Sequence, residues 1–267
     1  MKEIQLDNNQ LAAVDKAVNS RLSVITGGAG SGKTSTIKYL AEQLKAKGES
    51  VLLAAFAGKA AARIKEATGF EASTIHRMLG WMGDRFTLGS LQDHTVIIDE
   101  SSMVSSMLLA EITRRNPKRL VLVGDAAQLP PVGEGQPFHD IIHYFPNIVS
   151  RLTTCYRATE AVFKAATCIR NGDQPLMQDE SEHEKWKMVP TGDARATHQY
   201  ILELARTGYL DFSQDIILTP RNEDEANGAA AITPLNKDLV EIANPRESSD
   251  TDKFKAGDRI LNTKNMP

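Results

Sequence analysis

The sequence contains few cysteines, no long apolar run and no excess of basic residues. Cys155 and Cys168 are its only cysteines among 267 residues, which excludes a disulfide framework and is typical of a reducing compartment. No apolar run approaches the ~18–20 residues of a membrane helix, and the acidic start Met1-Lys2-Glu3 is unlike a signal peptide. We therefore expect a soluble, cytoplasmic protein with no membrane partner.

The two signs of charge are almost balanced. The chain has 31 Lys+Arg and 34 Asp+Glu, and hence a net charge of −3. A pI near 6.1 argues against a uniformly basic nucleic-acid binder but leaves room for a local cationic groove. With 41% hydrophobic and 24% charged residues the chain can bury a core, which excludes collagen-like, coiled-coil and largely disordered proteins.

Strand-like and helix-like segments alternate through the first half of the chain. Short apolar runs predict buried strands at residues 22–26, 51–55, 96–98 and 120–123. Amphipathic spacing predicts helices at residues 5–19, 34–47 and 58–67. This alternation predicts an α/β fold in which a parallel sheet is covered on both faces.

The pattern changes near residue 150, where we place a boundary between domains at 1–150 and 151–267. In the second part, helices are predicted at residues 158–171 and 234–242, and a strand at 215–218. In the first part, residues 80–89 have glycines around short apolar pieces. They form either a small hairpin insertion or a surface loop.

A phosphate-binding loop follows the first predicted strand. The pattern G-x-x-x-x-G-K-[ST] is matched in full by Gly27, Gly28, Ala29, Gly30, Ser31, Gly32, Lys33 and Thr34. Glycines let backbone N–H groups curl around an anion at the start of a helix, whose partial positive charge favours phosphate. Lys33 would reach the β- and γ-phosphates, and the Thr34 hydroxyl would coordinate Mg²⁺.

Two acidic residues, Asp99 and Glu100, follow the third predicted strand. Asp99 is placed to hold Mg²⁺ at the carboxyl edge of the sheet, directly or through water. Glu100 would polarise the attacking water, which favours hydrolysis over phosphoryl transfer to a small acceptor. The alternative is a pair of acids that only terminates a strand.

The fourth predicted strand ends at another acid, Asp125, and Gln128 follows three residues later. An uncharged amide near the γ-phosphate can report whether ATP or ADP is bound, because only ATP offers an acceptor there. The alternative is a turn in which Asp125 is a cap and Gln128 is solvated.

In this order, the motifs resemble those of superfamily 1B DNA helicases of the RecD-like branch, which are P-loop NTPases. Besides the motifs above, the resemblance rests on Gln10 and on the segments GKAAAR at 58–63, STIHRML at 73–79, YR at 156–157, LTPRN at 218–222 and GDRI at 257–260. It spans nearly the whole chain and is most specific through about residue 135.

The resemblance implies a RecA-like motor lobe, followed by part of a second one, that binds ATP and single-stranded DNA and moves 5′ to 3′. By matched position, Gln10 would read the adenine edge, and Arg157 would stabilise charge at the γ-phosphate as an arginine finger does. Residues 80–95 fall where such helicases carry a pin-like insertion that helps to split the duplex, which favours the hairpin.

Two features depart from the pattern of this family. Relatives usually have a proline and then a threonine that touches the DNA backbone, where this chain has Phe56 and Ala57. One phosphate contact is therefore in doubt, and Phe56 is either core or a base-stacking platform. The chain also stops at Pro267, before the motifs that complete a second lobe, so we expect either a fragment or an incomplete motor.

The DNA side of the first lobe needs cations for phosphates and flat groups for bases. Lys59 and Arg63 lie on a predicted helix, and His76 and Arg77 follow a Ser-Thr pair typical of a helix cap. We take these four residues as the candidate DNA contacts. The alternative for the cations is a solvated helix face, and for His76 a structural role.

These features together predict an ATP-dependent DNA helicase or translocase that uses Mg²⁺ and acts on single-stranded DNA or on a duplex with a single-stranded tail. Partner subunits of a repair or recombination complex are compatible with the resemblance. One alternative is a nucleotide- and DNA-binding subunit without unwinding activity. Another is a P-loop kinase, which the pattern at residues 124–130 argues against.

Overall fold

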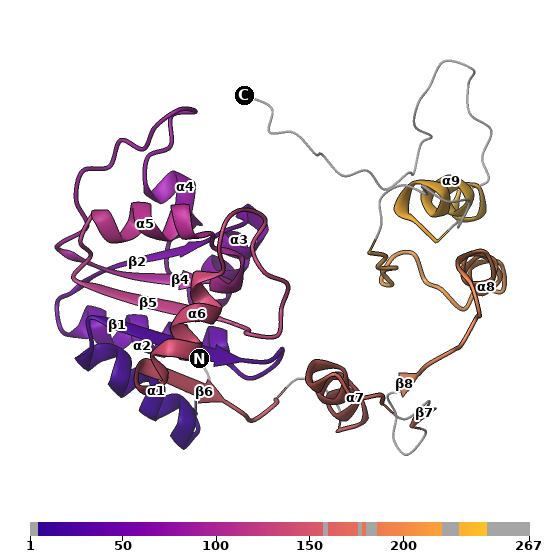
Figure 1. Cartoon of the computed structure of the whole chain (residues 1–267), viewed down its shortest axis with the longest axis horizontal. Helices are drawn as coiled ribbons and strands as arrows, with labels where there is room; N and C mark the ends of the chain where they lie inside the picture. The colour runs from indigo at the N-terminus through magenta and orange to yellow at the C-terminus, as the bar shows by residue number, and fades with distance from the viewer. Residues whose placement is uncertain (1–4, 157–159, 176–177, 180–185, 221–229, 245–267) are drawn as a thin grey trace. The chain divides into compact units, whose positions relative to one another are not determined.

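The computed structural model describes residues 5–156, 160–175, 178–179, 186–220 and 230–244 (Figure 1). Its elements, in chain order, are α1 (Asn8–Asn19), β1 (Leu22–Gly27), α2 (Lys33–Ala46), β2 (Ser50–Ala55), α3 (Gly58–Thr68), β3 (Ala72–Thr74), α4 (Ile75–Met78), β4 (His94–Asp99), the 3₁₀ turn η1 (Ser101–Met103), α5 (Ser106–Arg114), β5 (Arg119–Gly124), α6 (Pro137–Tyr144), the 3₁₀ turn η2 (Pro146–Ile148), β6 (Val149–Leu152), α7 (Glu160–Asn171), β7 (Gln178–Asp179), β8 (Trp186–Lys187), α8 (Ala194–Arg206) and α9 (Ile232–Ala243).

Six strands form one sheet in the order β3-β2-β4-β5-β1-β6, and every neighbouring pair is parallel. Leu22 of β1 lies opposite Leu120 of β5, and Val96 of β4 lies opposite the same residue from the other side. In this register, the carboxyl ends of β4, β5 and β1 lie side by side. The loops that follow these three strands therefore share one edge of the sheet.

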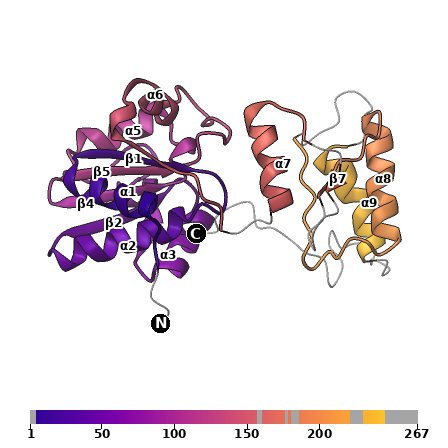
Figure 2. The same ribbon diagram turned by 90° about the horizontal axis from the view of Figure 1, so that it is seen from below.

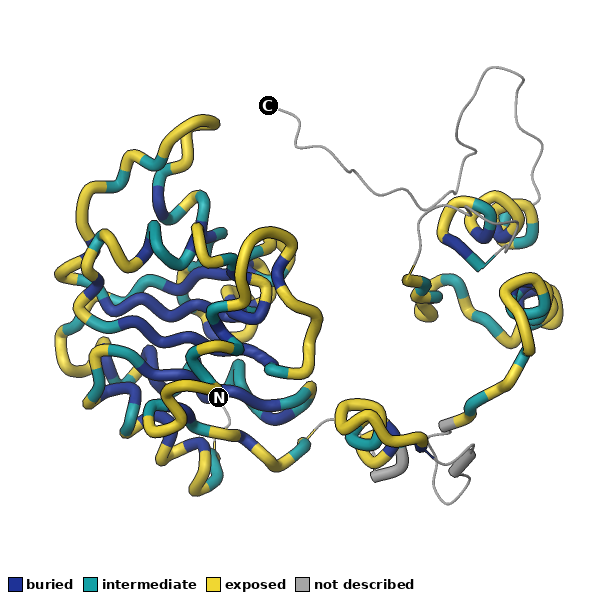
Figure 3. Tube along the Cα trace, in the orientation of Figure 1, coloured by how far each residue is buried: buried dark blue, intermediate teal, exposed yellow. Residues whose placement is uncertain are grey.

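Helices cover both faces of the sheet, as the alternation of segments predicted (Figure 2). Side chains of α1, α2 and α3 pack with Ile25, Val121 and other strand residues on one face. Side chains of α4, α5 and α6 pack with Val24, Leu122 and their neighbours on the other face. The strands of the sheet are accordingly the most buried part of this unit (Figure 3). The predicted α/β fold with a parallel sheet is confirmed.

Residues 80–88 form a short hairpin turn between α4 and β4. The backbone N–H of Thr87 donates to the carbonyl of Gly80 at 3.0 Å, and that of Met82 donates to the carbonyl of Arg85 at 2.9 Å. Trp81 and Phe86 form an antiparallel bridge inside this turn. Of the two alternatives drawn from the sequence, the structure thus has the hairpin.

The chain divides into two compact units, Met1–Trp186 and Lys187–Pro267. The boundary predicted near residue 150 falls inside β6, which pairs with β1 and so belongs to the first unit. In the second unit, α8 and α9 pack through Leu202, Ala205, Leu235 and Leu239. Its assignment as part of a second RecA-like lobe stays a prediction.

The strand predicted at residues 215–218 is wrong. The structure describes these residues but gives them no strand or helix. Ile216 and Leu218 are 75% and 89% exposed, and only Ile217 packs against the core of α8 and α9. No strand in the described part of the chain pairs with this run. The predicted helices at 158–171 and 234–242 correspond to α7 and α9. None of the described helices is long and apolar enough to cross a membrane.

Candidate nucleotide-binding site

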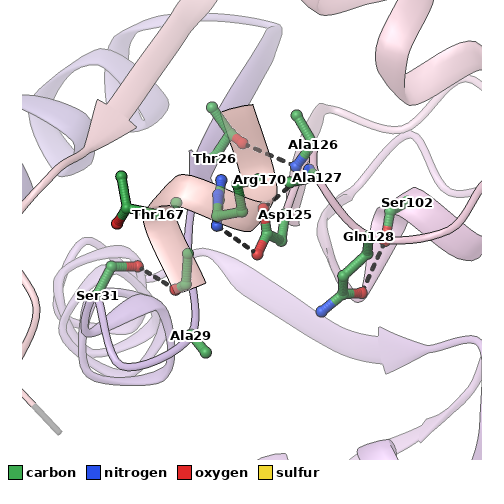
Figure 4. A network of polar contacts seen from close by, with 12 residues as sticks. Thr26, Ala29, Ser31, Ser102, Asp125, Ala126, Ala127, Gln128, Thr167 and Arg170 are labelled. Atoms are coloured by element: carbon green, nitrogen blue, oxygen red, sulfur yellow. Dashed lines mark hydrogen bonds and ion pairs between the residues drawn. The ribbon is translucent and has the colours of Figure 1, made fainter. Parts of the chain in front are cut away.

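Three loops meet at the carboxyl edge of the sheet. The phosphate loop follows β1, the acidic pair Asp99 and Glu100 ends β4, and Asp125 follows β5. Asp125, Asp99 and Glu100 all act electrostatically on Lys33 of the phosphate loop, where each negative charge works to raise the lysine pKa. The sequence motifs are therefore brought together at one site, part of which is drawn in Figure 4.

Lys33 lies folded back over the phosphate loop. Its Nζ donates to the carbonyl oxygens of Gly27 and Gly28 at 2.8 and 2.9 Å. Burial is the main cause that lowers the pKa of Lys33, and the nearby acids only partly offset it. A half-buried ammonium held by two carbonyls is ready to exchange them for the oxygens of a phosphate group, which carry more negative charge.

The loop is closed tightly around Ser31 and Gly32. The Ser31 hydroxyl is buried and donates to the Gly28 carbonyl at 2.8 Å. Gly32 has a φ of +78°, in the left-handed region that favours glycine, and ends the loop at the start of α2. Thr34 follows in the first turn of α2, where a hydroxyl can reach a cation held beside the phosphates.

Gln10 reaches the phosphate loop from α1. It is 3% exposed, and its Nε2 donates to the carbonyl of Ser31 at 3.3 Å. Its Oε1 accepts from the backbone N–H of Asp7 at 2.9 Å, while Asp7 Oδ1 accepts from the backbone N–H of Gln10 at 2.7 Å. This reciprocal capping box fixes the start of α1 against the loop. The structure thus places Gln10 against the loop of residues 27–34.

Asp99 is a buried carboxylate at the end of β4, 9% exposed. Burial raises its pKa to about 6, although a 2.9 Å hydrogen bond from the backbone N–H of Glu100 and the charges of Lys33 and Arg63 oppose this shift. A buried carboxylate with a raised pKa gains when a cation binds beside it. Asp99 therefore suits a divalent ion.

Glu100 has an unusual backbone and an unpartnered side-chain atom. Its φ of 52° lies in the left-handed region, which is uncommon for a residue with a side chain and occurs often at functional sites. Its Oε2 is buried and has no hydrogen-bond partner among the described residues. A buried carboxylate oxygen without a partner is suited to accept from a water molecule at the phosphate.

No group of three or more His, Cys, Asp or Glu side chains in the described part of the chain forms a metal site. Mg²⁺ is usually held by only one or two carboxylates together with substrate phosphates and water. Thr34 and Asp99 fit that arrangement, because the other ligands would come from the nucleotide.

Gln128 and Asp125 lie beyond β5. The Ser102 hydroxyl donates to Gln128 Oε1 at 3.1 Å, which joins the residues after β4 to those after β5. Asp125 is buried and accepts from the backbone N–H of Ala127 through Oδ1 and from Arg170 of α7 through Oδ2 (Figure 4). Arg170 did not stand out in the sequence.

Tyr156 contacts both the phosphate loop and the start of α1. Its backbone N–H donates to the carbonyl of Gly30 at 2.9 Å, and its phenol donates to Asp7 at 2.6 Å. Arg157, the predicted arginine finger, comes next but lies outside the described residues, as do residues 221–222 and 257–260 of the later motifs. The D-x-x-Q pattern of Asp7 and Gln10 is typical of a capping box and could have predicted their contact. No pattern in the neighbouring sequence predicts the contacts of Tyr156.

The four candidate DNA contacts lie on two neighbouring helices. A Cβ on Gly58, at the start of α3, would be 3.9 Å from the Cγ2 of Thr74, which caps α4, so the two helix starts adjoin. Lys59 and Arg63 are exposed on α3, and Arg77 is exposed on α4. The charge of Arg63 also lowers the pKa of the nearby Asp99, but less than the other causes do, of which burial of Asp99 is the largest.

His76 lies among aromatic rings. Its ring centroid is 6.5 Å from that of Phe56, 6.0 Å from that of Trp81 and 5.8 Å from that of Phe86. Phe56 packs against the second core cluster, and Trp81 is 42% exposed at the hairpin. His76 thus packs among these rings, of which Trp81 is the most exposed, and its role as a DNA contact stays a prediction.

Comparison with known proteins agrees with this geometry. A family model described as an AAA domain matches residues 5–190. The chain is 33% identical over 270 residues to the ATP-dependent RecD2 DNA helicase of Deinococcus radiodurans, a match that covers 97% of this chain and 36% of that protein. It is 35% identical over 213 residues to the RecBCD enzyme subunit RecD of Mycolicibacterium smegmatis, covering 66% of this chain and 38% of that protein.

A solved structure of the Pif1 helicase from Candida albicans superposes with a TM-score of 0.50 at 23% sequence identity, over 65% of this chain and 46% of that chain. This likeness shows a shared fold. The chain spans little more than a third of the length of the two curated relatives, at 36% and 38%. The resemblance to RecD-like superfamily 1B helicases is confirmed by these matches.

Proposed function

This chain belongs to the AAA domain family, and we propose that it forms the nucleotide-hydrolysing part of an ATP-dependent DNA helicase or translocase. The observation that carries the proposal is the meeting of Lys33, Asp99 and Glu100 at the carboxyl edge of one parallel sheet. The name of the RecD2 DNA helicase to which the chain is similar supplies the DNA side of the proposal.

In this proposal Lys33 exchanges its two carbonyl partners for the β- and γ-phosphates of ATP. Thr34 and Asp99 hold Mg²⁺, which when bound neutralises charge that develops on the phosphates. Glu100 accepts a hydrogen bond from the attacking water through its buried Oε2, for which the structure describes no protein partner. The backbone N–H groups of Gly28 to Gly32 surround the phosphates.

Three further residues complete the proposed site. Gln10, held at the loop by its bond to Ser31, reads the adenine edge. Gln128 senses the γ-phosphate and passes its state to η1 through Ser102. Arg157, the residue after Tyr156, acts as an arginine finger. Tyr156 is itself hydrogen-bonded to the phosphate loop.

The proposed substrate is single-stranded DNA, or a duplex with a single-stranded tail, with movement from 5′ to 3′. Lys59, Arg63 and Arg77 contact DNA phosphates in this proposal, with His76 beside them. Because the relatives include a subunit of the RecBCD enzyme, action with partner subunits in repair or recombination belongs to the same proposal. The cytoplasmic location expected from the sequence is also part of the proposal.

The test is steady-state ATP hydrolysis with and without single-stranded DNA. We expect DNA to stimulate hydrolysis, and Lys33→Ala to reduce it by about 100-fold or more, because one fixed charge on the transferring phosphate is lost. Lys38→Ala is the matched control, since it removes a lysine five residues further along the same helix. A duplex with a 5′ tail, compared with one carrying a 3′ tail, then tests unwinding and its direction.

Each other result contradicts a defined part of the proposal. Turnover that is indifferent to nucleic acid contradicts a DNA motor and favours a kinase or a different NTPase. Binding of nucleotide and DNA without stimulated turnover contradicts a motor within this chain and supports a binding subunit.

A further inference from the structure

Arg170, in the last turn of α7, reaches the phosphate loop. Its Nη1 is 2.9 Å from Oδ2 of Asp125. A Cβ built on Gly28 would lie 2.6 Å from the same nitrogen, so the guanidinium lies directly against the backbone of the loop (Figure 4). A second cation thus lies beside Lys33 at the place where a phosphate would bind.

The two partners of this ion pair differ in their freedom to move. The Asp125 side chain is 8% exposed and is fixed from its other oxygen by the backbone N–H of Ala127 at 3.0 Å. The Arg170 side chain is 36% exposed and belongs to a helix that comes after the whole sheet in the chain. Asp125 is therefore a fixed counter-ion, and Arg170 is the partner that can be drawn elsewhere.

Two cations, Lys33 and Arg170, lie near the phosphate loop together with the acids Asp125, Asp99 and Glu100. Lys33 and Arg170 lie close enough that the charge of Arg170 contributes, after burial, to the lowered pKa of Lys33. Two carbonyl oxygens accept hydrogen bonds from Lys33, and a single carboxylate accepts from Arg170. A guanidinium matches two oxygens of a phosphate group, which carries more charge than one carboxylate.

We propose that Arg170 is a further phosphate-binding residue. When a nucleoside triphosphate binds, the Arg170 side chain moves away from Asp125 and contacts the terminal phosphate. This inference rests on the proposed function, because it requires a nucleotide in the phosphate loop. Arg170 then distinguishes the triphosphate from the diphosphate. Since it is part of α7, it also couples the position of that helix to hydrolysis. With a diphosphate bound, Arg170 returns to Asp125.

The test measures dissociation constants for ATPγS and ADP, each with Mg²⁺, by displacement of a fluorescent nucleotide from the full chain. We expect Arg170→Ala to raise the dissociation constant of ATPγS by about tenfold or more, the usual effect of losing a hydrogen bond to a charged group. The constant for ADP should change less than about twofold. Arg170→Lys, which keeps the charge but not the planar fork, should fall between wild type and Arg170→Ala.

Arg114→Ala is the matched control, because it also removes an arginine from an ion pair, with Glu111 on α5. It should leave both constants unchanged. The thermal unfolding midpoint of each variant checks that the fold is kept, and a loss of fold would lower the affinity for both nucleotides equally.

Each remaining outcome overturns the inference. If Arg170→Ala lowers the dissociation constants of both nucleotides, Arg170 only obstructs the phosphate loop. If it raises both constants equally, or changes neither, Arg170 does not recognise the terminal phosphate. Failure of the proposed function looks different, because wild type would then bind neither nucleotide or bind both independently of Lys33.

Discussion

Tyr156 donates a hydrogen bond of 2.6 Å from its phenol to Oδ2 of Asp7, the residue that caps α1. This contact stabilises the ionised form of Asp7, since the Tyr156 hydrogen bond is the main cause that lowers the pKa of that carboxyl. The same tyrosine bonds Gly30 through its backbone. The residue before Arg157 is thus joined to the cap of α1 and to the phosphate loop at once.

We expect Tyr156→Phe to lower ATP turnover by less than about tenfold while ATP affinity stays nearly constant. The phenol holds the segment that leads into Arg157, whereas the phosphate loop keeps its own backbone bonds. The measurement is kcat for hydrolysis together with the dissociation constant for ATPγS. Tyr144→Phe removes the hydroxyl of another exposed tyrosine in the same unit and should change neither value. A larger loss of affinity than of turnover would contradict this role.

Gly32 and Gly48 form a natural pair for testing the fit of Gln10 against the loop. Both have positive φ angles, of +78° and +75°. A Cβ on Gly32 would clash with the amide nitrogen of Gln10, whereas a Cβ on Gly48 would meet nothing within 4 Å. Gly48→Ala should therefore cost only the left-handed backbone, about 1–2 kcal/mol of unfolding free energy.

Gly32→Ala should cost at least about 1 kcal/mol more than Gly48→Ala, because Gln10 must move from a well-packed position. It should also weaken nucleotide binding, which Gly48→Ala should leave intact. Urea unfolding of the two variants measures the difference in stability. Equal losses in both variants would mean that Gln10 does not press on the loop.

The central strands were predictable because each is a short run of apolar residues that is mostly buried. The runs at residues 22–26, 51–55, 96–98 and 120–123 lie within β1, β2, β4 and β5. The edge strands β3 and β6 have only three and four residues and are partly exposed, so they carry no such run. The strand expected at 215–218 had the apolar run, but it pairs with no strand among the residues that the structure describes.

The site divides in the same way. Lys33, Asp99 and Glu100 belong to local motifs, each of which comes at or soon after the end of a predicted strand. Arg170 and Asp125 are 45 positions apart, and Tyr156 and Asp7 are 149 apart. Nothing in the neighbouring sequence encodes such pairs, because they arise only when separate loops meet at one edge of the sheet.

Asp99 gives the site a dependence on pH. Its pKa of about 6 exceeds its ordinary value of 3.8, so folding buries a charge above pH 6. Each pKa unit corresponds to about 1.4 kcal/mol, and the cost in unfolding free energy is therefore about 3 kcal/mol at neutral pH. As the pH falls from 6 to about 4, the folded protein takes up this proton before the unfolded chain does, and the cost disappears.

Asp99→Asn should therefore stabilise the nucleotide- and metal-free protein by up to about 3 kcal/mol at pH 8, and by almost nothing at pH 4. The same variant should lose Mg²⁺-dependent ATP hydrolysis. Urea unfolding across this range measures the effect, and Asp93→Asn, at an exposed aspartate just before β4, is the control. A gain in stability that does not depend on pH would contradict a buried charge at Asp99.

The last prediction concerns the cations on α3 and α4. Lys59 and Arg77 are exposed near the adjoining starts of these helices, whereas Lys65 on α3 pairs with Glu71 at 2.8 Å. Arg63 is unsuitable for a clean test, because its charge also acts on Asp99. Lys59→Ala and Arg77→Ala should each weaken binding of single-stranded DNA without sequence preference.

Each of these two changes should also reduce the slope of log affinity against log salt concentration by about 0.7, the contribution of one phosphate contact on a single strand. Lys65→Ala should leave the slope unchanged, because its partner is a protein carboxylate. Fluorescence anisotropy of a labelled oligonucleotide at several salt concentrations measures both affinity and slope. If Lys65→Ala changes the slope as much as Lys59→Ala does, the effect is one of net charge, and the starts of α3 and α4 are not the DNA face.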